Sequence, residues 1–147
     1  MRSLFIVIGL MLVLSGCASV PLSSRDFDEA GKSFKAAADK SNVYLFRNEN
    51  FGAAALLTVT LNGKVMGQTA AKTYYLWELP PGEHEITSVG ENVSSIKLKT
   101  APGRSYYVWQ EVKMGLFLPR SLLQEVDEET GQKGVGESQR AQGGVSY

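Results

Sequence analysis

The sequence predicts an all-β protein: a small antiparallel β-sandwich of about seven or eight strands, with a short N-terminal helical segment and a flexible C-terminal tail. Apolar and polar side chains alternate in short segments throughout residues 40–127. Turn signals such as Asn62-Gly63 and Pro81-Gly82 separate these segments. A helical spacing of apolar residues precedes them, so we expect one β-sandwich domain at residues 40–127.

The chain opens with the layout of a secretory signal peptide. Arg2 is the only charged residue before residue 25, and residues 4–14 are apolar apart from Gly9. This run is shorter than the roughly 20 apolar residues that a membrane-spanning helix needs. We therefore predict that residues 1–16 are a signal that is removed from the mature chain.

The end of this signal, Leu14-Ser15-Gly16-Cys17, resembles the lipobox of bacterial lipoproteins. The resemblance implies that Cys17 receives a diacylglycerol and that its new amino terminus is acylated after cleavage. Ala18 stands where an aspartate retains enteric lipoproteins at the inner membrane. We therefore expect a lipid-anchored protein of the cell envelope, on the outer membrane and facing the periplasm. The alternative is a plain signal peptide with an incidental cysteine.

Residues 17–39 are predicted to form a lipidated tether and a short helical segment. The tether, residues 18–25, is small and polar with one proline. Phe27 and Ala30 begin a helical spacing of apolar residues, with Asp26 as the candidate cap.

Leu57, Val59 and Leu61 alternate with threonines, which is typical of a half-buried strand. That strand ends at Asn62-Gly63, because both central residues of a type I′ turn need positive φ. The same criteria predict further strands near residues 42–47, 64–67, 73–79, 86–87, 96–99, 105–113 and 121–126.

Residues 128–147 are expected to form a flexible tail. Residues 131–147 contain five glycines and few side chains that could be buried.

The composition argues against nucleic acid as a partner. The full chain has 15 basic and 15 acidic residues, and loss of residues 1–16 removes Arg2 alone, which leaves a net charge of −1 with His84 neutral. Nucleic-acid binding depends on a basic surface that this sequence does not show. Cys17 is the only cysteine, so no disulfide can form within the chain.

Four segments carry a resemblance to a known family: VYLFR (43–47), LNGKVMGQT (61–69), YYLWELPPGEH (74–84) and PGRSYYV (102–108). In this order they resemble an uncharacterised family of small bacterial lipoproteins with a VYxxR, NGxxxG, PGxH and GxxYY pattern, a domain of unknown function. The second and third segments also resemble the PEGA-type β module. These are turn motifs, so the resemblance implies a fold and an envelope location but no catalytic residue.

His84 is the only histidine, and two glutamates flank it. A general base needs a nucleophile within reach, and the chain shows no GxSxG motif, second histidine or free cysteine. One histidine also provides no ligand spacing for zinc. We therefore predict no enzymatic activity, no metal site and no cofactor. His84 is interpreted as a half-buried ring with one hydrogen-bonded nitrogen.

Arg47 shares a strand face with Val43 and Leu45, where an unpaired charge is costly. It either forks onto a carboxylate or loop carbonyls, or it recognises an anionic group of a ligand.

The strands at 73–79 and 105–113 carry matching aromatic runs. Alternation predicts that Trp77 points to the core, whereas Tyr74, Leu76, Tyr107 and Trp109 point outward. Either the helical segment or the C-terminal region covers this face, or it is an open wall that suits a sugar ring or a partner protein.

These observations predict a lipid-anchored, non-enzymatic envelope protein whose β-sandwich is a binding or structural module. Its expected partners are the membrane, through Cys17, and an envelope protein or glycan. The alternative is a peptidoglycan or surface-glycan binding module that uses Arg47, Tyr107 and Trp109. A hydrolase would need a nucleophile that the sequence does not show.

Overall fold

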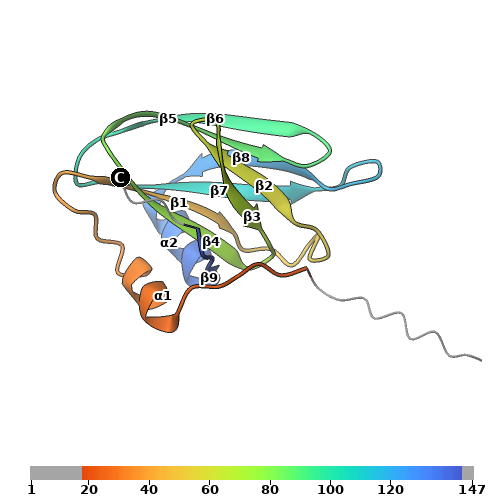
Figure 1. Cartoon of the computed structure of the whole chain (residues 1–147), viewed down its shortest axis with the longest axis horizontal. Helices are drawn as coiled ribbons and strands as arrows, with labels where there is room; N and C mark the ends of the chain where they lie inside the picture. The colour runs from red at the N-terminus through yellow and green to blue at the C-terminus, as the bar shows by residue number, and fades with distance from the viewer. Residues whose placement is uncertain (1–17, 144–147) are drawn as a thin grey trace, which may run out of the picture.

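The computed structural model describes residues 18–143, which form a small β-sandwich of two sheets (Figure 1). One sheet has the order β8-β7-β1-β4-β9 and the other the order β3-β2-β5-β6. The strands are β1 (Ser41–Arg47), β2 (Leu57–Leu61), β3 (Lys64–Thr69), β4 (Thr73–Leu79), β5 (Gly82–Val89), β6 (Val93–Thr100), β7 (Ser105–Lys113), β8 (Arg120–Val126) and β9 (Gln139–Arg140). The helices are α1 (Arg25–Gly31) and α2 (Glu128–Gly136). The predicted fold class is confirmed, and β9 is an addition to the strands predicted.

Two pairs of strands depart from the antiparallel pairing that the sequence predicts. β1 pairs in parallel with β7, and β4 pairs in parallel with β9. β1 and β7 are far apart in the sequence, and the chain passes through the other sheet between them. A parallel pair requires such a crossover, and no local pattern in either strand reveals it.

The turn after β2 has the predicted conformation. Asn62 and Gly63 have φ values of 51° and 80°, as a type I′ turn requires, and β2 pairs antiparallel with β3. Gly82, which follows the two prolines, has a φ of 146° and begins β5.

The main core lies between the two sheets. Trp77 is fully buried there, as the strand alternation predicts. The other buried members are Val43, Leu45, Val59, Leu61, Tyr75, Leu79, Ile86, Leu98, Val108, Leu123 and Ala141. All seven residues of β1 are buried, so both faces of the five-stranded sheet are covered at this strand.

The prediction of a flexible tail over residues 128–147 is wrong for residues 128–143. Residues 128–136 form α2, and the Asp127 side chain caps it by accepting the Thr130 N–H at 2.7 Å. α2 packs against β1 and β7, on the outer face of the five-stranded sheet. Its glycines make this contact possible, because a Cβ at Gly131 or Gly134 would overlap the rings of Tyr107 or Phe46. Residues 144–147 lie outside the described residues.

The predicted tether is also part of the folded body. Ser23 donates its N–H to Arg140 O at 2.8 Å, and Gln142 donates its N–H to Pro21 O at 2.9 Å. The predicted helix exists as α1, but its cap is Ser24 rather than Asp26, since Ser24 Oγ accepts the Phe27 N–H. Residues 21–23 therefore run along the C-terminal segment of the domain.

Candidate functional site

The outer face of the five-stranded sheet, which we call the aromatic face, consists of Tyr44, Phe46, Tyr74, Leu76 and Tyr107. Tyr74, Leu76 and Tyr107 lie on this outer face, as the strand alternation predicts, but they are 0%, 7% and 2% exposed and do not meet solvent. Val135 of α2 packs among these side chains, and Phe34 packs against them from the segment after α1. The interpretation that helical and C-terminal residues cover this face is the one the structure shows.

The tyrosines of the aromatic face use their hydroxyl groups internally. Tyr44 donates to Gly31 O at 2.7 Å, and Tyr74 donates to Asp28 Oδ1 at 2.8 Å. The rings of Tyr44 and Tyr107 are stacked at 5.1 Å. Burial raises the pKa of all three tyrosines, so their hydroxyls stay protonated at neutral pH. The aromatic face is therefore a second core, and its hydroxyls attach α1 to the sheet.

Trp109 lies at the margin of this second core. It packs against the same cluster but keeps a partly exposed side chain. Its indole N–H is buried and has no hydrogen-bond partner among residues 18–143. Of the two aromatic residues predicted to contact a ligand, Tyr107 is covered and Trp109 is only partly accessible.

Arg47 is fully buried and points into its own domain. Its Nη1 donates to Ala55 O at 2.8 Å and to Thr69 O at 3.1 Å, and its Nη2 donates to Gly52 O at 2.7 Å. Burial lowers the pKa of the guanidinium, although the nearby Glu49 carboxylate acts in the opposite direction. Arg47 thus binds carbonyl groups of the loop between β1 and β2. Of the two interpretations from the sequence, this is the internal one rather than recognition of an anionic ligand.

Both ring nitrogens of His84 form hydrogen bonds, whereas the sequence predicted a hydrogen bond at only one of them. Nε2 lies 2.7 Å from Pro80 O, and Nδ1 lies 2.9 Å from Asn62 Nδ2. A carbonyl only accepts, so Nε2 carries the proton and Nδ1 accepts from the amide. Asn62 Oδ1 in turn accepts the Glu85 N–H at 2.9 Å. His84 therefore joins the two turns, with neither nitrogen free for proton transfer.

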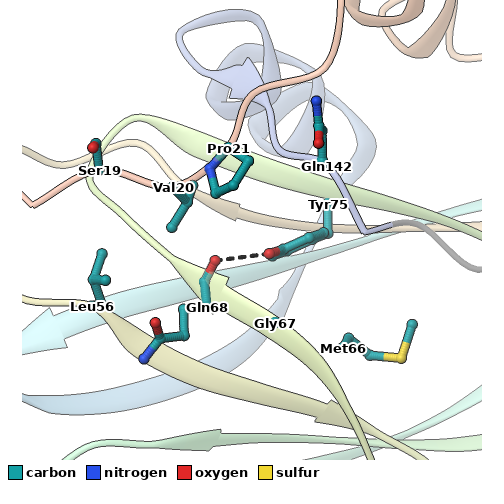
Figure 2. Close-up of a pocket in the computed structure, with 9 residues that line it drawn as sticks. All are labelled: Ser19, Val20, Pro21, Leu56, Met66, Gly67, Gln68, Tyr75 and Gln142. Atoms are coloured by element: carbon teal, nitrogen blue, oxygen red, sulfur yellow. Dashed lines mark hydrogen bonds between the residues drawn. The ribbon is translucent and has the colours of Figure 1, made fainter.

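A cavity of about 300 Å³ lies where residues 19–21 cross β3 (Figure 2). Tyr75 points into it and donates its hydroxyl proton to Gln68 O at 2.8 Å. The residues that line it are Ser19, Val20, Pro21, Leu56, Met66, Gly67, Gln68, Tyr75 and Gln142. Its lining contains no carboxylate, ammonium or imidazole group, so it resembles a seam between the N-terminal segment and the sheet more than a reaction site.

One surface feature, the segment between β7 and β8, was not predicted from the sequence. Residues 114–118, which we call the apolar loop, hold Met114, Leu116, Phe117 and Leu118 at exposures of 79%, 80%, 89% and 62%. The available signal was an apolar run that follows the last strand residue without alternation.

Residues 18–143 also bear on metal binding and on membrane spanning. This part of the chain contains no group of three or more His, Cys, Asp or Glu side chains placed to hold a metal ion. Within the same residues, no helix is both long enough and apolar enough to cross a membrane. Cys17, the predicted lipidation site, lies outside the described residues.

Comparisons with known proteins place the chain among uncharacterised relatives. It is 30% identical to an uncharacterized protein of Haemophilus influenzae over 131 residues, which cover 88% of this chain and 78% of that relative. No solved structure matches it. Residues 37–120 match the family described as protein of unknown function (DUF2846). This range spans β1 to β7 with the turns that connect them, so the chain belongs to the DUF2846 family.

Proposed function

We propose that this protein is a lipid-anchored lipoprotein of the cell envelope whose β-sandwich serves as a non-catalytic binding or structural module. The observation that carries the proposal is the position of Ala18, the residue after the lipobox cysteine. Its N–H donates to Ala53 O at 3.1 Å, and Ser19, Val20 and Pro21 continue along the cavity (Figure 2). The residue next to the proposed lipid is therefore already attached to the folded domain.

This attachment determines what a lipid on Cys17 does. Each buried methylene contributes about 0.8 kcal/mol, and two or more acyl chains hold a protein stably on a membrane. With Ala18 hydrogen-bonded to the domain, no flexible linker separates the domain from the lipid. The anchor would hold the sandwich close to the membrane surface, and we place it on the periplasmic side of the outer membrane.

The non-catalytic part of the proposal is supported by the residues that could have done chemistry. His84 is held between two turns by both nitrogens. Arg47 is buried under loop carbonyls. Neither presents a reactive group to a substrate.

A peptidoglycan-binding module would need an open aromatic surface. Tyr107 lies beneath α2, so the platform for stacking a sugar ring is reduced to part of Trp109. We therefore expect the detergent-solubilised protein to stay in the supernatant when cell-wall sacculi are pelleted. Cosedimentation that is lost in Trp109→Ala would revive the glycan-binding alternative.

The test of the anchor compares wild type with Cys17→Ser, both expressed as the full chain. Wild type is expected in the membrane fraction with a lipid mass on its amino-terminal cysteine. Cys17→Ser is expected as an unprocessed precursor or a soluble periplasmic protein without lipid. Ser19→Ala, which leaves the cysteine intact, is the control and should retain the lipid. A wild-type protein without lipid mass on Cys17 would overturn the proposal.

A further inference from the structure

The apolar loop is the largest concentration of exposed apolar side chains among the described residues. Its four large side chains follow one another closely, and Phe117 is the most exposed at 89%. Another exposed apolar side chain, Val93, lies in the β5–β6 hairpin and is 67% exposed. It is two residues after Glu91, whose carboxylate accepts a hydrogen bond from Phe117 N–H in the loop. Contiguous exposed apolar side chains mark surfaces that contact a partner or a membrane.

Glu91 binds the backbone of the apolar loop. The Glu91 carboxylate accepts the N–H groups of Leu116, Phe117 and Leu118 at 2.9, 2.8 and 3.1 Å. These hydrogen bonds, that of Phe117 first, lower the pKa of Glu91 to about 2. Three backbone donors of the loop are thus satisfied from within the protein. An apolar medium penalises unsatisfied backbone groups, so this arrangement suits a loop that enters one.

The apolar loop lies at the end of the sandwich where the described chain begins. β1 and β7 are parallel, so the loops that follow them leave the same end of the sheet. The β1–β2 loop packs against the end of β7, just before the apolar loop, since a Cβ at Gly52 would lie 2.9 Å from Val112 Cγ1. Ala18 is hydrogen-bonded to Ala53, the next residue of the same loop. Figure 1 shows the start of the described chain and the β7–β8 loop at the same, right-hand end.

The flanks of the apolar loop suit the headgroup region of a bilayer. Lys113 precedes the loop and Arg120 follows it, and their side chains are 50% and 55% exposed. Each is paired with a carboxylate, Lys113 with Glu111 at 3.0 Å and Arg120 with Glu91 at 3.2 Å. Long basic side chains can bury their methylene stems while their charges stay in water near phosphates. The loop therefore has an apolar tip between charged, exposed flanks, which is the polarity expected of a segment that lies in a membrane interface.

We propose that the apolar loop is a membrane-contacting element that inserts Phe117 and its neighbours into the phospholipid surface to which Cys17 is attached. The inference rests on the proposed anchor and adds the orientation of the domain. The occupant is the bilayer itself, because the proposed lipid on Cys17 would bring the membrane to the end of the sandwich at which the apolar loop lies. Two attachment points, the lipid and the loop, would fix which face of the sandwich points into the periplasm.

The test places a fluorescent reporter in the loop of the full, lipidated chain. Phe117→Trp is reconstituted into vesicles of phosphatidylethanolamine and phosphatidylglycerol with brominated acyl chains, which quench tryptophan that enters the bilayer. Phe27→Trp is the matched control, since Phe27 is also exposed, at 63%, but lies on α1 at the opposite end in Figure 1. The wild-type signal of Trp77 and Trp109 is subtracted. Phe117→Trp is expected to lose most of its added fluorescence, and Phe27→Trp to lose little.

The possible results separate this inference from the anchor proposal. Lipid mass on Cys17 without preferential quenching of Phe117→Trp would overturn the membrane-contacting loop and leave the anchor standing. Quenching of Phe117→Trp in a protein that carries no lipid on Cys17 would support insertion of the apolar loop into the bilayer and would overturn the proposed lipid anchor. Unquenched Phe117→Trp whose emission shifts with protein concentration would identify a second copy as the occupant and overturn the inference.

Discussion

The aromatic face and the apolar loop are both rich in large apolar side chains, yet the fold treats them in opposite ways. The aromatic face spreads over β1, β4 and β7 and is covered by α2, which leaves Phe46 2% exposed. The apolar loop occupies five consecutive residues at one end of the sandwich, and Phe117 is 89% exposed. One region gains its order from packing, and the other from a carboxylate that binds its backbone.

The difference shows that aromatic content alone does not identify a binding surface. Burying a large apolar side chain contributes about 1.5–3 kcal/mol, so a sheet face with five of them strongly favours a segment that covers it. The glycine-rich segment after β8 fulfils this role because its small residues allow close contact. The apolar loop has no such cover among residues 18–143, and it is the region that points to function.

The sharpest test of the comparison is to truncate the same residue type in both regions. Phe46→Ala removes a buried ring and is expected to lower the free energy of unfolding by about 3–5 kcal/mol. Phe117→Ala removes an exposed ring and is expected to change it by no more than about 0.5 kcal/mol. Denaturant midpoints of both variants measure the difference. Equal losses would mean that the loop is packed in solution and that the two regions do not differ.

A smaller effect is expected at the contact between α2 and the aromatic face. Gly134→Ala introduces a methyl group against the Phe46 ring, so the helix must move, at a cost of about 1–3 kcal/mol. Gly136→Ala is the matched control in the same helix, because its added Cβ meets nothing within 4 Å. That substitution is expected to be neutral or to stabilise by up to about 1 kcal/mol. If Gly134→Ala is as stable as Gly136→Ala, the helix does not pack on this face as described.

The smallest expected effect concerns the order of the apolar loop and its pH dependence. The folded pKa of Glu91, about 2, lies below its ordinary value of 4.5. The stabilisation that the ionised Glu91 carboxylate gives to the folded loop is therefore fully present above about pH 4.5 and is lost as the pH falls through 2. NMR of the amides of residues 116–118 should follow this titration, while core amides stay unchanged.

Glu91→Gln is the companion variant for the same measurement. It keeps one acceptor oxygen but no charge, so the three loop amides should exchange faster with solvent at neutral pH. Glu83→Gln, an exposed glutamate in β5, is the control and should leave them unchanged. A titration of the loop amides near pH 4.5 would show that Glu91 does not bind them in solution.

The strands and turns of this protein could be predicted from the sequence because their causes are local. Alternation over five to nine residues places Trp77 in the core, and Asn62-Gly63 accepts positive φ wherever the strands go. The environment of the candidate site residues could not be predicted from strand alternation alone. Alternation placed Tyr107 on the outer face of its strand, but it could not say whether that face meets water or protein.

What only the tertiary structure decided depends on residues that are distant in sequence. Gly131 accepts the ring of Tyr107, which lies more than twenty positions earlier, and β7 joins β1 in parallel after the chain has passed through the second sheet. The glycines that indicated a flexible tail allow α2 to pack closely, because a helix with small residues can approach a sheet of large aromatic rings. Likewise, Glu91 and the apolar loop meet only when the β5–β6 and β7–β8 turns are brought to one end of the sandwich. Local patterns specify which backbone a segment adopts, whereas the covering of its side chains is decided by which distant segment can reach and fit them.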